Sequence, residues 1–357
     1  MKRIVIIALL LLAVGAFVLS PLLTSKSSSE LAIARLNFVG NIQTVYGRIL
    51  PVSFKVPEGI TKVELIYNDS LFQQWLAPKG SIQFPLTPSI YGVGTKSIVL
   101  RSYLQDGTVL DDSRLIRVVS DVVPKLNKAV IVQSYPHSTE SYTQGLEFDG
   151  NVLYEGTGDP GQQGKTTVGQ VDLSKGTFTA IKNGLDHTYF GEGITIMGDE
   201  LFQLTWRNGK CFVYDKNTMK LLREYTYTGE GWGLCNNGQY LIQSDGTERL
   251  YFRDPKNFQV VRTIEVYDNK NPRILLNELE YIDNRIYANV YQSNTVLVIE
   301  PGTGRVLEEI DASDLEKEGK GSGDVLNGIA YNKEKKQLFM TGKNWSKLFQ
   351  VSIEAKP

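Results

Sequence analysis

Few residues of this chain could do chemistry, and one carboxylate stands out among them. Glu192 lies between Gly191 and Gly193 at the start of the stretch GEGITIMGDELFQLTW, which ends at Trp206. A carboxylate beside a large aromatic ring can act as a general acid or base, because an apolar wall raises the pKa of a carboxyl group. The stretch has the pattern of a β-hairpin, in which both chain ends lie at the same end of the element.

Other common catalytic groups are scarce. The 357 residues include two histidines, His137 and His187, and two cysteines, Cys211 and Cys235. A zinc site of the Cys/His kind lacks ligands, and the chain has no G-x-S-x-G nucleophile elbow. Both cysteines lie in expected strands, where buried thiols are more usual than a disulfide, although pairing stays open. We therefore expect acid/base chemistry without a catalytic metal.

Two classes of binding site are excluded by pattern. The segment GQQGKTT at 161–167 resembles part of a phosphate-binding loop, but Asp159 stands where that loop requires its first glycine. We expect this segment to be a plain connection between two strands. The chain carries 38 basic and 39 acidic residues, so no nucleic-acid surface is expected.

The N-terminus predicts export. Lys2 and Arg3 precede an apolar run from Ile4 to Leu19, which is typical of a secretory signal. A cleaved signal peptide and a retained membrane anchor both fit, because the run is long for a signal core and short for a span. Residues 1–29 are expected to be this hydrophobic signal or anchor helix with a polar tether. The mature protein would then work in the periplasm or anchored on the extracytoplasmic side of the membrane.

Residues 30–122 are expected to form a small β-sandwich. Alternating runs such as VSFKV and KVELIYN are separated by turn clusters such as PEG and QDG. About seven short strands over such a length are typical of an immunoglobulin-like sandwich, although the Cys…Trp…Cys core of antibody domains is missing. No polar cluster here suggests chemistry, so we expect a spacer or docking module, linked onward by 121–130.

The remaining region, 128–357, contains a repeat. Its five units are TQGLEFDGNVLYEGTG, GEGITIMGDELFQLTW, GWGLCNNGQYLIQSDG, LNELEYIDNRIYANVY and LNGIAYNKEKKQLFMTGK. Each unit has a polar residue, a Gly or Glu and an aliphatic residue, followed by a turn and a second apolar strand. A repeat of about 45 residues with several strands per unit is typical of a β-propeller, so we expect an all-β fold with five blades.

Hairpin geometry predicts that both ends of every unit gather at one mouth of the propeller channel. The residues at the unit starts are Gln144, Glu192, Trp232, Asn277 and Asn327, and those at the unit ends are Glu155, Trp206, Asp245, Tyr291 and Lys343. Such a mixture of amide, carboxylate, ammonium and indole groups suits a small polar substrate with an apolar rim.

Some of these polar residues are expected to hold blades together instead. Asp245 and Asn327 are the expected ties, and Glu155 and Glu280 are similar candidates. Glu192, by contrast, is the only charged residue at its position of the repeat, and Lys343 is the only cation at its position. We therefore expect both to be functional, with the glycines beside Glu192 leaving room for a substrate.

These motifs together resemble one family. In chain order they are TQGL, FGEG, LTW, GWGL, SDG, LNELEY, DVLNGIAY and TGKNW, and the match runs from about 134 to about 353. They are similar to the glutaminyl cyclases of the plant and bacterial type, which are glutaminyl-peptide cyclotransferases on a five-bladed propeller. The resemblance implies that the N-terminal glutamine of peptides or proteins is converted to pyroglutamate with release of ammonia. The sandwich lies outside the match.

The resemblance also implies a role for each site residue. The acid/base glutamate maps onto Glu192, and its supporting groups map onto Gln144, Asn277 and Lys343. The aromatic wall maps onto Tyr142, Phe190, Trp206, Trp232 and Tyr291. Lys343 or Asn277 would stabilise the amide oxygen, and Gln144 would orient the substrate. Tyr142 and Tyr291 replace the usual phenylalanine and tryptophan, which implies altered affinity and not a loss of activity.

Cofactors and partners follow from the same resemblance. No cofactor is implied for catalysis, and a structural calcium ion in the channel, held by main-chain carbonyls, is left open. The implied partners are Gln-initiated peptides or proteins, with the membrane as a further partner if the N-terminal segment is retained, and the protein is expected to be a monomer. The alternative is an exported propeller without catalysis that binds peptides or glycans. Such a protein would lose the acid, whereas FGEG, LNELE and TGK are intact.

Overall fold

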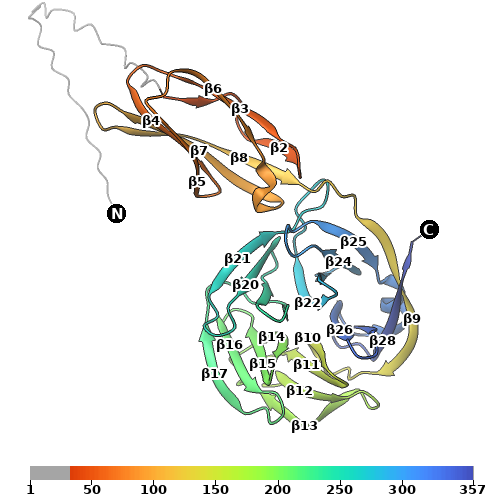
Figure 1. Ribbon diagram of the computed structural model, residues 1–357. Coiled ribbons are helices and arrows are strands. Elements are labelled where there is room, and N and C mark those ends of the chain that lie inside the picture. Colours follow the sequence, from red (N-terminus) through yellow and green to blue (C-terminus); the bar gives the residue numbers. More distant parts are fainter. Residues whose placement is uncertain (1–32, 357) are drawn as a thin grey trace, which may run out of the picture.

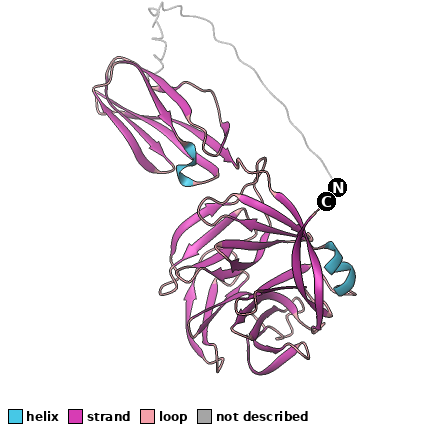
Figure 2. Cartoon of the chain, turned by 45° about the vertical axis from the view of Figure 1, so that its right-hand side comes forward, coloured by secondary structure: helices cyan, strands magenta, loops and turns pink. Residues whose placement is uncertain are grey.

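The computed structural model describes residues 33–356, which form two regions built almost entirely of strands (Figures 1 and 2). The helical elements of this part are the short turn η1 (Pro88–Tyr91) and helix α1 (Ser313–Gly319). The signal or anchor segment expected at 1–29 lies outside the described residues. Within 33–356, none of the helices has the length and apolar character needed to cross a membrane.

The first region consists of two sheets around one apolar core. One sheet has the order β1–β3–β6 and the other has the order β2–β8–β7–β4–β5. The strands are β1 (Arg35–Leu36), β2 (Ile42–Val45), β3 (Leu50–Val56), β4 (Ile60–Tyr67), β5 (Ser70–Leu76), β6 (Gly80–Leu86), β7 (Gly94–Leu104) and β8 (Val109–Val119). Alternation along β4 and β7 buries Val63, Leu65, Ile98 and Leu100 completely while the intervening residues face outward.

The second region is a ring of antiparallel sheets (Figure 1). Three of them have four strands each, in the sequence order β10–β13, β14–β17 and β18–β21. Their bounds are β10 (Tyr142–Asp149), β11 (Val152–Gly158), β12 (Thr167–Asp172), β13 (Thr177–Gly184), β14 (Gly191–Met197), β15 (Glu200–Thr205), β16 (Lys210–Asp215), β17 (Leu221–Thr226), β18 (Leu234–Asn236), β19 (Leu241–Ser244), β20 (Arg249–Arg253) and β21 (Val260–Glu265). The segment 161–167 joins β11 to β12 as expected.

An eight-stranded sheet completes the ring, in the order β22–β23–β24–β25–β9–β28–β27–β26. Its strands are β9 (Lys125–Pro136), β22 (Leu276–Ile282), β23 (Arg285–Val290), β24 (Thr295–Ile299), β25 (Val306–Asp311), β26 (Leu326–Asn332), β27 (Gln337–Gly342) and β28 (Lys347–Ala355). Strand β9 pairs antiparallel with β28 and parallel with β25, so it joins the beginning of the ring to its end. Of the segment 121–130, which was expected to be a linker, 125–130 thus belong to the ring.

Buried polar side chains connect the inner strands of neighbouring sheets. Glu278 accepts the amide hydrogens of Leu146 and Ile329 at 3.3 and 2.8 Å. Asn327 donates to the carbonyl of Thr143 at 3.0 Å, which confirms it as a tie between sheets. Glu280 accepts the amide of Tyr331 at 3.2 Å and so joins β22 to β26, the two edge strands of the eight-stranded sheet. The innermost strands are therefore joined by side chains, not by a continuous β-ladder.

The other two expected ties behave differently. The prediction for Asp245 was wrong, because its carboxylate accepts from Thr247 and Tyr251 of its own sheet. Glu155 accepts from Thr143 at 2.7 Å and contacts His137 at 3.0 Å. His137 follows β9, so this buried pair holds the first sheet of the ring to the closing strand.

The two cysteines are free and buried, which confirms the interpretation as core thiols. Cys211 lies in β16 and Cys235 lies in β18, and neither forms a disulfide. Burial raises the pKa of both thiols. They are accordingly packing residues and not nucleophiles.

The two-sheet region is attached to the ring by a partly charged, buried interface. Lys96 of β7 forms a 2.7 Å ion pair with Glu265 at the end of β21, and both side chains are nearly inaccessible to water. The same Glu265 carboxylate accepts the amide of Thr95 at 3.0 Å. Tyr267 of the ring packs into the core of the two-sheet region. A buried pair of this kind tolerates few alternative arrangements, because separating the partners would leave an unpaired buried charge.

The buried carboxylates of the ring predict a dependence of stability on pH. Burial raises the pKa values of Glu278 and Glu280 well above the ordinary 4.5. A raised carboxyl pKa means that the folded state retains protons which the unfolded chain releases. The contribution of these two groups to the free energy of unfolding is then greatest at acidic pH, and it falls as the pH rises above about 4.5.

Two matched substitutions test this. Glu280→Gln can still accept from Tyr331 but cannot ionise, so its unfolding free energy should fall less than that of the wild type between pH 5 and pH 8 in urea titrations. Glu278→Gln has only one acceptor oxygen for two backbone amides, so it should be less stable at both pH values by roughly 1–3 kcal/mol. A Glu280→Gln variant that loses stability with pH as steeply as the wild type would contradict this account.

Candidate active site

The central polar side chains lie on β-bulges at the start of four inner strands. In β10 the extra residue is Gln144, and in β14 both Glu192 and Gly193 stand opposite a single residue of β15. The same irregularity occurs at Asn277 in β22 and at Asn327 in β26. A bulge re-aims side chains locally. These residues can therefore face the centre of the ring while the rest of each strand keeps its apolar pattern.

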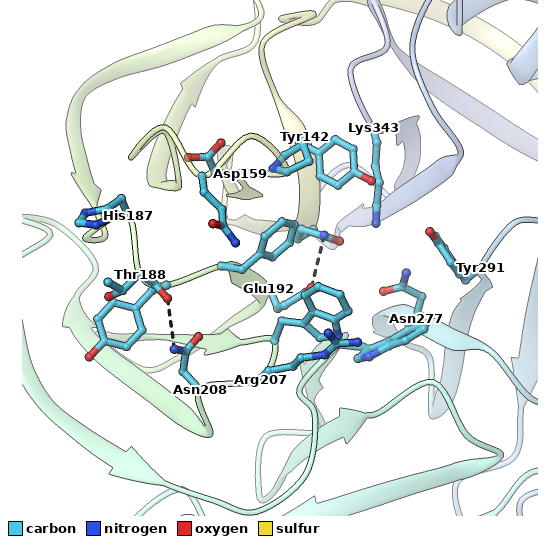
Figure 3. Close-up of a pocket in the computed structure, with 17 residues that line it drawn as sticks. Tyr142, Asp159, His187, Thr188, Glu192, Arg207, Asn208, Asn277, Tyr291 and Lys343 are labelled. Carbon is cyan, nitrogen blue, oxygen red and sulfur yellow. Dashed lines mark hydrogen bonds between the residues drawn. The ribbon is translucent and has the colours of Figure 1, made fainter. Parts of the chain in front are cut away.

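A cavity of about 490 Å³ lies at this end of the ring (Figure 3). It is lined by all of the predicted site residues, namely Tyr142, Gln144, Phe190, Glu192, Trp206, Trp232, Asn277, Tyr291 and Lys343. Three other residues expected at the mouth, Glu155, Asp245 and Asn327, lie outside its lining. Hairpin geometry thus brought the correct side chains together, while the three others serve the framework.

Glu192 is an acid held away from water. Its side chain is only 5% exposed. Burial raises its pKa well above the ordinary value of 4.5, the positive charge of Lys343 opposes this rise, and the negative charge of Glu230 adds to it. Gln144 donates to the Glu192 carboxylate through Nε2 at 3.4 Å. Burial therefore makes this carboxyl group easier to protonate than an exposed glutamate, which suits a group that both accepts and donates a proton.

The amide of Gln144 is fixed at both ends. Asn327 donates through Nδ2 to the Gln144 side-chain oxygen at 3.3 Å. This bond turns the Gln144 amide nitrogen towards Glu192. A chain of amides thus runs from β26 through β10 to the carboxylate on β14.

Lys343 supplies a buried cation on another side of the cavity (Figure 3). Its ammonium lies 4.8 Å from the ring centre of Tyr142 and 5.2 Å from that of Tyr291. Burial lowers the pKa of Lys343, while Glu192 and Asp324 oppose this effect. Within the described part of the chain, the Lys343 nitrogen forms no hydrogen bond and no ion pair. The ammonium is therefore free to donate to a ligand.

Asn277 faces the same space from β22 (Figure 3). Its side chain is buried, and its Oδ1 finds no hydrogen-bond donor among residues 33–356. Buried polar atoms are normally paired. An unpaired amide at the cavity wall therefore indicates a place where a ligand, a water molecule or an ion completes the bonding.

One carboxylate organises the aromatic wall. Oε2 of Glu230 accepts the indole hydrogens of Trp206 at 2.8 Å and Trp232 at 2.9 Å. Its Oε1 accepts from Nε of Arg207 at 2.9 Å, and the guanidinium stacks 3.7 Å from the Trp206 ring centre. Partial burial alone would raise the pKa of Glu230, but these hydrogen bonds lower it. The ionised group thus fixes both indoles.

The remaining rings complete the wall by edge-to-face contacts. Phe190 lies 5.7 Å from Trp206 and 6.2 Å from Tyr142, between ring centres. Trp232 lies 5.5 Å from Tyr291. Such contacts favour one arrangement of the rings over others. The cavity is therefore preformed, with Glu192, Lys343 and Asn277 among its polar groups.

The glycines beside Glu192 have a different purpose from the expected one. A Cβ atom on Gly193 would lie 2.4 Å from the backbone nitrogen of Leu234, and one on Gly191 would lie 2.6 Å from the side chain of Thr166. These neighbours belong to the framework and not to the cavity. The prediction that the glycines leave room for a substrate was therefore wrong: they allow the backbone of β14 to approach the adjacent sheet.

Sequence reasoning missed the outer part of the cavity and the carboxylate behind its wall. The outer lining comes from 159–162, 187–189 and 207–208. These residues lie in loops outside the repeated hairpin pattern, so their only sequence signal is proximity to a motif. Arg207 follows the LTW motif, and Glu230 precedes GWGL. Neither position could be assigned a role without the contacts to Trp206 and Trp232.

Among the described residues no group of three or more His, Cys, Asp or Glu side chains could hold a metal ion. The unpaired oxygens here are the amide oxygens of Asn277 and Asn327. Oxygen atoms of this type suit a hard cation such as calcium as well as water.

Comparisons with known proteins identify the family of this chain. The sequence model described as glutamine cyclotransferase matches residues 109–353. A glutaminyl-peptide cyclotransferase of Arabidopsis thaliana is 39% identical over 241 residues, which are 66% of this chain and 74% of the plant protein. The crystal structure of Myxococcus xanthus glutaminyl cyclase is 36% identical, with a TM-score of 0.61 over 66% of this chain and 100% of that one. The matched range of the family includes every residue of the cavity and all of the ring except the end of β28. The chain therefore belongs to the glutamine cyclotransferase family.

Proposed function

We propose that this protein is a glutaminyl-peptide cyclotransferase, which converts the N-terminal glutamine of peptides or proteins to pyroglutamate and releases ammonia. The observation that carries the proposal is the presence of a buried acid, Glu192, and a buried cation, Lys343, in the lining of one aromatic cavity. A protein that only binds peptides or glycans would have no need to hold two such charges away from water, which is costly.

The reaction places three demands on the cavity. The α-amine must approach the side-chain amide carbon, a proton must move from the attacking nitrogen to the leaving nitrogen, and the amide oxygen must be stabilised as negative charge develops on it. The amine nitrogen forms a bond to the carbon, the carbon–nitrogen bond of the side-chain amide breaks, and ammonia departs.

Glu192 is assigned the proton transfer. In its ionised form it accepts the proton of the attacking amine, and in its protonated form it delivers that proton to the departing ammonia. The second step requires a carboxyl group that holds a proton near neutral pH, and burial raises the pKa of Glu192 in this direction. Gln144 is assigned to holding Glu192 in place, and not to orienting the substrate as the resemblance implied, because both ends of its amide already bond to the protein.

Lys343 and Asn277 are assigned to the amide oxygen. Both reach the cavity from neighbouring parts of its wall (Figure 3), and the ammonium has no competing hydrogen bond within residues 33–356. Donors fixed before the reaction stabilise a developing oxyanion without reorganising. Trp206, Trp232 and Tyr291 would enclose the glutamine side chain and keep water away from it.

The finer architecture is part of the proposal. We treat the ring as a five-bladed propeller in which the eight-stranded sheet counts as two blades joined by the pairing of β9 with β25. Residues 30–122 are then an immunoglobulin-like sandwich, and 128–357 are the catalytic propeller. Residues 1–29 would export the monomeric protein, to the periplasm or anchored on the extracytoplasmic side.

Replacing the acid is the direct test. Glu192→Gln keeps the size of the side chain but cannot carry the proton, so kcat for a Gln-initiated peptide should fall by about 10²–10⁴-fold. Ammonia release and the mass of the product report the reaction. Glu140→Gln changes an exposed glutamate outside the cavity and is the matched control. Full activity in Glu192→Gln would refute the proton-transfer role of Glu192. An inactive wild type would refute the proposed enzymatic function.

The pH dependence of kcat/KM provides a second test, because two neighbours act on Glu192 in opposite directions. Lys343→Met removes a positive charge that lowers the Glu192 pKa, so the acidic limb of the profile should move to higher pH. Glu230→Gln removes a negative charge that raises this pKa, so the limb should move to lower pH. The substrate amine titrates identically with all variants. Shifts in the same direction would show that the limb does not report Glu192.

A calcium ion in the channel, which the family resemblance leaves open, would be structural. The unpaired oxygens of Asn277 and Asn327 fit such an ion. EDTA should then lower the midpoint of thermal unfolding by a few degrees, because a ligand of the folded state is removed. kcat should stay unchanged. A loss of turnover that calcium restores would instead place the ion in the reaction.

A further inference from the structure

The cavity extends well beyond the groups that ring closure uses. Its additional lining comes from three loops at the same end of the ring, namely 159–166 between β11 and β12, 185–190 between β13 and β14, and 206–209 between β15 and β16. All three belong to the first two sheets of the ring. The cavity is therefore lopsided, with an outer groove on one side of Glu192.

The groove lies opposite the side that holds the proposed oxyanion donors. Figure 3 shows His187, Thr188 and Asn208 on one side of Glu192, and Lys343 and Asn277 on the other. When the glutamine amide of a substrate binds those donors, the main chain that follows the glutamine still needs a binding place in the cavity. Tyr142, which donates to Asp324 at 3.0 Å, closes the cavity beside Lys343. The groove is the direction in which the cavity continues.

The groove presents unused hydrogen-bonding groups. Asn208 donates through Nδ2 to the carbonyl of Thr188 at 3.2 Å, which joins two of the loops and leaves its Oδ1 without a donor within residues 33–356. Arg207 uses only Nε on Glu230, and its terminal nitrogens bond to none of the described residues. The amide of Gln162 is exposed and equally unengaged. These groups can donate to carbonyls and accept from amides.

The charges of the groove favour no particular substrate side chain. Arg207 is paired with Glu230, and the carboxylate of Asp159, which also lines the cavity, accepts the backbone amide of Lys165 at 2.9 Å. Charges of both signs that are already engaged by the protein provide little selection between an acidic and a basic residue. The amide groups, in contrast, match the repeating donors and acceptors of a main chain.

We propose that this groove binds the main chain of the residues that follow the N-terminal glutamine, through the side chains of Arg207, Asn208 and Gln162. Arg207 donates to a main-chain carbonyl, and Asn208 accepts a main-chain amide. The inference rests on the proposed cyclotransferase function, since it takes the glutamine to lie between Glu192 and Lys343.

The test compares substrates of increasing length. kcat/KM is measured for glutaminamide and for Gln-Ala, Gln-Ala-Ala and Gln-Ala-Ala-Ala amides, and it should rise over the first added residues and then level off. The ratio of kcat/KM for the longest amide to that for glutaminamide should fall about fivefold in Asn208→Ala and in Gln162→Ala, which is the effect of about one hydrogen bond. Gln239→Ala, an exposed glutamine in the turn between β18 and β19 at the opposite end of the ring, is the matched control.

A binding measurement separates this inference from the function. Calorimetry on the Glu192→Gln protein gives dissociation constants for the same amides without turnover. Tighter binding of the longer amides, weakened by adding Asn208→Ala, supports the groove. If neither the rate of cyclisation nor the dissociation constant depends on the length of the amide, the proposed role of the groove is refuted and the proposed cyclotransferase function is not. Length-dependent binding without cyclisation in the wild type would overturn the function and leave the groove.

Discussion

The site depends on keeping one carboxylate out of water while leaving it reachable. Moving an ionisable group into a protein interior is costly unless partners compensate. For Glu192 these partners are the amide of Gln144 and the charge of Lys343, and each comes from a different sheet of the ring. No single strand or hairpin could supply both. A closed ring of sheets meets this requirement, because its centre is the place where the starts of all inner strands converge.

The bulges explain how polar residues reach this centre without disturbing the sheets. A regular strand alternates its faces, so a polar residue in the middle of an apolar pattern would break the packing between sheets. The extra residue at Gln144, Glu192, Asn277 and Asn327 provides a local change of direction. The glycines beside Glu192 allow the distorted backbone to lie against its neighbour. The polar residues at the centre of the ring and the closely packed backbone thus lie in the same short segment of each strand.

The same principle, a charge paired across elements far apart in the chain, recurs elsewhere. Glu230 holds two indoles and a guanidinium behind the cavity wall. Glu265 fixes the two-sheet region to the ring through Lys96. In both places a buried or partly buried carboxylate is satisfied by several donors at once, which gives the contact a defined geometry. A preformed wall of this kind reduces the ordering that substrate binding would otherwise require.

The sequence by itself determined the all-β class, the repeat and the inner residues of the cavity, because hairpin geometry is local and the repeat places equivalent positions at one end of the ring. Glu192, Lys343, Trp206, Trp232 and Tyr291 were predictable in this way, whereas Tyr142 and Phe190 followed from the motifs of the family. Only the tertiary structure decided which polar residues serve the framework: Asn327 reaches across to Thr143, whereas Asp245 stays within its own sheet. It also decided the purpose of the glycines, the role of Glu230 and the outer groove. These features depend on contacts between segments that are distant in the chain, and such contacts leave no periodic signal in the sequence.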